Sequence, residues 1–354
     1  MGVVSFGRAL GVLLAGVVVA IGAFIALSAL GVMRQSVSLS MDSGLLSPSF
    51  LVMLIPFTAW SYGLRVFRWH TLVRRLVPDL PLTVSGYTQV VGFAFSASPG
   101  RVAELYKLKL LERSTRIPVA QSLPAAIVER ITDAAAFGLL VVIGGIFNWS
   151  DALDQRGTPW WLVLLTGLTI LTLVGYASRR QPLARRLARS VANVWATRIQ
   201  HWARIVPGFN RVTGVLTQLG SGSSKVISPV SVGIALACVI LGRLGDGIIL
   251  YQIARTVGYP VPYSMALIMI GSAGLAGGIT LAPGGFGTTE ATLVGLIVAR
   301  GAPLGVAMVT AFGARALIFW FWVILGLLVF IVTHSKPIMS AVGLGARTEL
   351  IAKE

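Results

Sequence analysis

The sequence has few charged residues: Asp, Glu, Lys and Arg together make up only 12% of its 354 positions. Soluble domains carry about 25%, so this chain has too few charges to cover a surface that faces water. Apolar residues make up 55%, and several uncharged runs are long enough to cross the roughly 30 Å hydrocarbon core of a bilayer. The composition therefore predicts a polytopic, all-α integral membrane protein.

Cysteine and histidine are also scarce. The one cysteine, Cys238, lies in an apolar run, which excludes a disulfide framework and a thiolate cluster. The three histidines, His70, His201 and His334, lie far apart and lack the spacing of metal ligands. The nucleotide-binding patterns GxxxxGK[ST] and GxGxxG are absent, as is the hydrolase pattern GxSxG. We therefore expect no metal and no cofactor.

Acidic residues are outnumbered, with 12 Asp and Glu against 29 Lys and Arg, which gives a formal net charge of +17. The excess lies in loops beside apolar segments, where basic residues set membrane orientation and contact anionic lipid, so it does not indicate nucleic-acid binding. The longest polar connection, residues 179–228, contains nine basic and no acidic residues. These biases predict a multi-pass protein of the inner membrane with both termini in the cytoplasm.

Six full spans and two shorter apolar segments are predicted. The spans lie near residues 9–33, 49–69, 119–149, 160–178, 229–254 and 304–332. The shorter segments, 82–98 and 263–282, each end at a Pro/Gly break. Both flanks of the first carry basic clusters, which the positive-inside rule places in the cytoplasm. The clusters consist of Arg65, Arg68, Arg74 and Arg75, and of Arg101, Lys107, Lys109, Arg113 and Arg116.

The two breaks occupy corresponding places in two halves of the chain, and each is followed by a carboxylate, Glu104 or Glu290. Such paired interruptions predict a transport site at the interface of an inverted repeat. We expect two inverted halves, near 1–178 and 229–333, each with a re-entrant hairpin, in one membrane domain over 1–333 with a cytoplasmic tail at 334–354. The break residues are Ser98, Pro99 and Gly100, and Pro283, Gly284, Gly285 and Gly287.

Several ionisable residues fall inside or beside apolar segments, where each costs on the order of 2.5–3.5 kcal/mol on insertion. They therefore predict a shared polar interior. The alternatives are internal (i, i+3) salt bridges, carboxylates that complement helix N-termini, and, for the Gly-rich run 271–287, close helix packing. The candidate site residues are Arg101, Glu104, Lys107, Glu129, Arg130, Asp133, Arg243, Asp246, Glu290 and Arg315.

Four short motifs occur in a fixed order along the chain. They are Pro99-Gly-Arg101-x-x-Glu104-x-x-Lys107, Glu129-Arg130-x-x-Asp133, Pro283-Gly-Gly-x-Gly-x-x-Glu290, and Arg315 before an aromatic span. With them the chain resembles, over nearly its whole length, the flippase-like transmembrane family found as the membrane half of bacterial lysylphosphatidylglycerol synthases. The resemblance implies a lipid-translocating domain with two re-entrant hairpins. Only 22 residues follow Val332, so we expect a stand-alone member without the synthase domain.

The motifs and the polar interior together predict a flippase or transporter for an anionic phospholipid or a polyprenyl-phosphate-linked lipid. Its partners are membrane lipids, and a homo-oligomer is left open. Arginines suit phosphate oxygens, and carboxylates would balance or relay charge. The phosphate contacts are expected from Arg101, Arg130 and Arg315, and the charge balance from Glu104, Asp133, Asp246 and Glu290. A membrane-embedded glycosyl- or headgroup transferase with a lipid-phosphate donor is the alternative, and an accessory membrane subunit is a third hypothesis.

Overall fold

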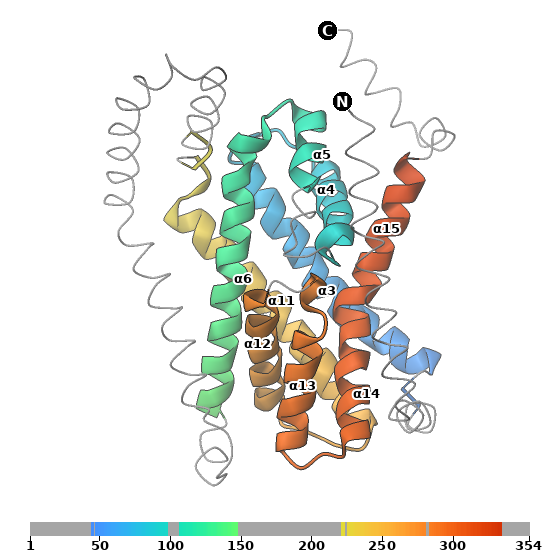
Figure 1. Cartoon of the computed structure of the whole chain (residues 1–354). Helices are drawn as coiled ribbons and strands as arrows, with labels where there is room; N and C mark the ends of the chain where they lie inside the picture. The colour runs from blue at the N-terminus through green and yellow to red at the C-terminus, as the bar shows by residue number, and fades with distance from the viewer. Residues whose placement is uncertain are drawn as a thin grey trace, which may run out of the picture.

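The computed structural model describes residues 44–45, 47–97, 106–147, 221–223, 225–280 and 283–334 (Figure 1). All regular elements within these ranges are helical, as the composition predicts. The predicted spans 9–33 and 160–178, most of the basic connection and the tail lie outside the described residues.

The described part of the chain contains twelve helical elements. In chain order they are α3 (Pro48–Val73), α4 (Leu82–Ala94), the 3-10 turn η1 (Phe95–Ala97), α5 (Tyr106–Thr115), α6 (Val119–Phe147), α11 (Pro229–Thr256), α12 (Tyr263–Ile279), the 3-10 turn η3 (Pro283–Gly285), α13 (Thr288–Ala299), α14 (Leu304–Arg315), the π-helical turn η4 (Ala316–Trp320) and α15 (Phe321–His334).

Three of the described helical stretches are long and apolar enough to cross a membrane. They are α3, α11 and the continuous stretch from α14 through η4 to α15, and they correspond to the predicted spans 49–69, 229–254 and 304–332. Helix α6 has 29 residues and covers the predicted span 119–149, with its charged residues inside it. The apolar runs of the sequence thus located the long helices to within a few residues.

Helices α3 and α11 begin in the same way, one in each half of the chain. Ser47 and Ser228 precede a proline at the first helical position, and their hydroxyls accept hydrogen bonds from the backbone N–H groups of Phe50 (3.4 Å) and Ser231 (3.1 Å). A serine cap satisfies an N–H group that the helix leaves unpaired, and the proline has none to lose. The two helices pack extensively against each other.

Two broken helix pairs approach the middle of the bundle from opposite ends. In Figure 1, α4 and α5 occupy the upper part and α12 and α13 the lower part, and turns η1 and η3 are in contact. At 1.5 Å rise per residue these helices are about 15–26 Å long, shorter than the roughly 30 Å core of a bilayer. Gly284 and Gly285 break the second pair with φ values of 60° and 70°, which favour glycine because it lacks a Cβ atom.

Glycine also allows α6 and α12 to pack closely. A Cβ atom added at Gly271 would lie 2.6 Å from the carbonyl oxygen of Phe137, and one at Gly144 would lie 2.5 Å from that of Ser264. Since the obstructing atoms belong to the backbone, neither helix can yield without moving away. Close helix packing, one of the alternatives for the Gly-rich run, is therefore correct for Gly271.

We expect Gly271→Ala to destabilise the protein by about 1–3 kcal/mol, because the added methyl group overpacks the α6–α12 contact. Thermal unfolding in detergent, followed by tryptophan fluorescence, measures the change. Gly233→Ala in α11 is the matched control, since no atom lies within 4 Å of its added Cβ, and alanine favours a helix by up to about 1 kcal/mol over glycine. Equal unfolding temperatures for the two variants would contradict the close contact.

Candidate functional site

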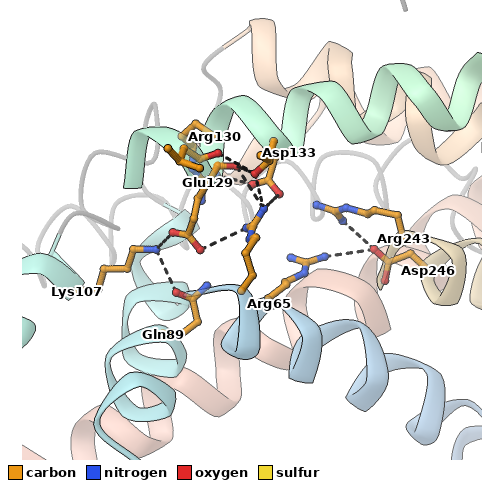
Figure 2. A network of polar contacts seen from close by, with 11 residues as sticks. Arg65, Gln89, Lys107, Glu129, Arg130, Asp133, Arg243 and Asp246 are labelled. Carbon is orange, nitrogen blue, oxygen red and sulfur yellow. Dashed lines mark hydrogen bonds and ion pairs between the residues drawn. The ribbon is translucent and has the colours of Figure 1, made fainter. Parts of the chain in front are cut away.

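Glu129 of α6 lies at the centre of a buried charge network. It is fully buried, and its carboxylate pairs with the guanidinium of Arg68 (3.4 Å) and with the ammonium of Lys107. Lys107 also donates to the side-chain oxygen of Gln89 at 3.1 Å (Figure 2). Its ammonium lies 4.1 Å from the centre of the Trp69 ring. Glu129 thus joins α3 and α5 to α6, and Lys107 extends the network to α4.

Asp133, one turn further along α6, extends this network. Its Oδ1 accepts from Nη1 of Arg68 at 2.8 Å, and its Oδ2 lies 3.5 Å from Nη1 of Arg130. Arg68 Nη1 also donates to the hydroxyl of Thr132 at 3.2 Å. The same guanidinium therefore contacts both carboxylates of α6, which fixes α3 against α6 inside an apolar bundle.

A second polar group joins α3 to α11. Oδ2 of Asp246 lies 2.8 Å from Nη1 of Arg243 and 3.3 Å from Nη2 of Arg65 (Figure 2). The guanidinium carbons of Arg243 and Arg65 lie 4.3 Å and 5.6 Å from the centres of the Phe137 and Phe93 rings. Asp246 is buried at 1% exposure, so it pairs with both arginines from inside the bundle.

The second helix break holds a third ion pair. Nε of Arg315 donates to Oε1 of Glu290 at 2.7 Å, and its Nη2 donates to the carbonyl oxygen of Gly284 at 2.8 Å. Oε2 of Glu290 accepts from the backbone N–H of Gly287 at 2.8 Å. Glu290 therefore complements the N-terminus of α13, one of the alternatives derived from sequence, and it ties α14 to the break. The Arg315 guanidinium lies 4.3 Å from the centre of the Phe319 ring.

A cavity of about 510 Å³ lies against these ion pairs. Its charged lining residues are four arginines and one aspartate, while glycines of α12 and aromatic side chains make up much of the remaining wall. Ile279, which is 74% exposed, and the exposed Gly278 also line it, so the cavity opens at the end of α12. The charged lining residues are Arg65, Arg130, Asp133, Arg243 and Arg315.

The structure brings together most of the candidate residues that it describes. The break residues Ser98, Pro99 and Gly100, and with them Arg101 and Glu104, lie outside the described residues, so their expected roles stay predictions. Glu129 and Lys107 belong to the network beside the cavity and do not line it. Arg130–Asp133 and Arg243–Asp246 form the (i, i+3) salt bridges that were the alternative to a functional role, and Arg130, Asp133 and Arg243 also line the cavity.

Arg65, Arg68 and Lys107, which the sequence analysis counted in the cytoplasmic flanking clusters, form ion pairs between helices. Arg68 and Lys107 are buried, and Arg65 is directed at Asp246. Helix α3 continues to Val73, beyond the predicted end of the span, so these arginines lie within the helix. The sequence did contain a signal for this, because Arg65 and Arg68 lie before the end of the predicted span 49–69. Gln89 was also missed, because a single amide in an apolar segment carries no pattern.

The chemistry of the lining suits an anion. Guanidinium groups bind the oxygens of phosphate or carboxylate through paired N–H donors. Among the described residues, no three His, Cys, Asp or Glu side chains come together as a metal site would need.

A family model described as the lysylphosphatidylglycerol synthase TM region matches residues 8–326, nearly the whole chain. A search of curated proteins gives no match.

Proposed function

Because the chain belongs to the lysylphosphatidylglycerol synthase TM region family, we propose that it moves a lipid with an anionic headgroup between the two leaflets of the inner membrane. The chain is a membrane protein, since this is a membrane family and three described helices are long enough to span a bilayer. The proposal adds to this a movement of lipid between the leaflets and a class of lipid.

The observation that carries the proposal is the arginine-lined cavity. Four guanidiniums line a space of about 510 Å³ inside an apolar helical bundle. Buried cations are costly in a membrane and tend to mark the path of a charged substrate. The exposed Gly278 and Ile279 at the edge of the cavity would let acyl or prenyl chains stay in lipid while the headgroup enters. A headgroup site with a lateral opening is what a flippase needs.

The arrangement of the two broken helix pairs supports two inverted halves. They approach the centre from opposite ends, and turns η1 and η3 touch there. In the proposed membrane domain, 1–333, the halves 1–178 and 229–333 would each contribute one re-entrant hairpin. The cavity would lie between them, where alternating motion of the halves exposes it to either leaflet. The same geometry suits either coupled transport or downhill scrambling.

Reconstitution into liposomes tests the function. Fluorescent phosphatidylglycerol and polyprenyl-phosphate probes are placed in one leaflet, and their arrival in the other is followed by chemical quenching. Arg130→Gln should slow translocation by about tenfold or more, because a charge-assisted contact to the headgroup is lost. Arg113→Gln is the control, since Arg113 is exposed at the end of α5.

Two outcomes would contradict a flippase. If neither probe changes leaflet faster than in protein-free liposomes, translocation is refuted. A chemically altered lipid, detected by mass spectrometry after addition of a lipid-phosphate donor while the leaflet distribution stays constant, would favour the transferase. Thermal unfolding of each variant confirms that a loss of transport comes from the site and not from misfolding.

A further inference from the structure

Two arginines from different halves of the chain share one carboxylate beside the cavity. Arg65 of α3 and Arg243 of α11 both contact the same oxygen of Asp246, at 3.3 Å and 2.8 Å. Both arginines line the cavity, whereas Asp246 does not. This group of three side chains therefore has two positive charges and one negative charge, and it presents its positive side to the cavity.

Each guanidinium keeps hydrogen-bond capacity for a ligand. A guanidinium carries five N–H donors, and the contact with Asp246 involves one nitrogen of each, Nη2 of Arg65 and Nη1 of Arg243. Cation–π contacts of Arg243 with Phe137 and of Arg65 with Phe93 help to hold both groups in place. Two guanidinium groups that share one counter-ion match a ligand group that has several oxygens and at least one negative charge.

We propose that Arg65 and Arg243 form the subsite that binds the phosphate group of the lipid headgroup, an inference that rests on the proposed function. The remaining N–H groups of both arginines bind the non-bridging phosphate oxygens, and the phosphate balances the excess charge on α3 and α11. Because the two helices belong to different halves, the bound phosphate bridges the halves. The sequence alone assigned the phosphate to Arg101, Arg130 and Arg315, and Arg65 was not among the candidates.

The same lining disfavours a headgroup that carries an ammonium group. Among the described residues that line the cavity, Asp133 is the one carboxylate, and it is already bound by Arg68 and Arg130. Among the described lining residues, an ammonium would therefore meet four guanidiniums and one carboxylate that two arginines already bind. The subsite selects phosphate headgroups with a net negative charge over aminoacylated ones.

Binding of short-chain lipids to the purified full-length chain tests the subsite. Dioctanoyl phosphatidylglycerol and farnesyl phosphate represent two lipid sources of phosphate, inorganic phosphate represents the free ion, and dioctanoyl lysylphosphatidylglycerol represents the ammonium headgroup. We expect both anionic lipids to bind at least about tenfold more tightly than the lysyl lipid. Inorganic phosphate should compete with them only weakly, because it lacks the apolar chains.

Arg65→Gln should weaken the binding of both anionic lipids by at least about tenfold. This variant leaves Asp246 paired with Arg243, so the fold keeps its buried counter-ion. Arg75→Gln is the matched control, because Arg75 is exposed in the turn that follows the same helix and is absent from the cavity lining. Arg65→Lys keeps the charge but loses the paired N–H donors of the guanidinium, so it should recover only part of the affinity.

The outcomes separate this inference from the proposed function. Unchanged lipid affinity in folded Arg65→Gln, or tighter binding of the lysyl lipid, would overturn the subsite even if translocation in liposomes is intact. Arginine-dependent binding without any translocation would support the subsite and overturn the flippase. If Arg65→Gln does not fold, the Arg65→Lys variant and the order of affinities in the wild type decide the question.

Discussion

Replacing Glu129 with alanine is expected to destabilise the protein by about 3–5 kcal/mol, the cost of breaking a buried ion pair by removing one partner. Glu129 is fully buried between two cations, Arg68 and Lys107, which are themselves almost inaccessible. Without the carboxylate, Lys107 keeps only Gln89 and the Trp69 ring among the contacts described above. A charge desolvated in this way costs far more than an exposed one.

Equilibrium unfolding in detergent measures this effect, and the chain offers a matched control. Glu112 pairs with Lys109 on the exposed side of α5, so Glu112→Ala should cost only about 0–1 kcal/mol. Both variants remove one carboxylate, but Glu129 loses two buried ion pairs, whereas Glu112 loses one exposed pair. If Glu129→Ala were no more destabilising than Glu112→Ala, the buried network would not hold α3, α5 and α6 together.

The local ion pairs, which the sequence offered as the alternative to a functional role, are present because helix geometry favours them. Residues three apart lie on one face of a helix, and the structure places Arg243 beside Asp246 and Arg130 near Asp133. The contacts between helices follow no such rule. That Arg68 reaches Glu129, or that Arg65 reaches Asp246, depends on how α3 packs against α6 and α11, and no spacing in the sequence encodes that packing.

Arg65 and Arg68 illustrate a limit of inferring membrane orientation from the positions of basic residues. The positive-inside rule treats basic residues near the end of a span as flanking signals. Arg65 and Arg68 lie within α3 and bind carboxylates of other helices, while Arg74 and Arg75 are exposed beyond its last turn. Residues a few positions apart thus play different roles, and only their partners distinguish them. The orientation of the membrane domain therefore stays a prediction.

The second helix break was predicted more readily than the turn that follows Arg315. Proline interrupts a helix because it lacks an N–H donor, and glycine allows the positive φ that the break needs at Gly284. The π-helical turn over Ala316–Trp320 has no such marker. Phe319 of this turn packs close to Gly284, a tertiary contact that no local sequence pattern indicates. Turns of this kind often occur at functional sites.

The central claim is that the headgroup passes through the arginine-lined cavity, and obstruction of its opening tests this most directly. In a Cys238→Ala background, Gly278→Cys places a thiol where no other atom lies within 4 Å of the added Cβ. Labelling this thiol with a bulky maleimide should reduce lipid translocation by about tenfold or more, on the scale of losing a charged headgroup contact. Asp79→Cys, on an exposed turn after α3, should remain active when labelled. Complete labelling at Gly278→Cys with an unchanged translocation rate would contradict the account.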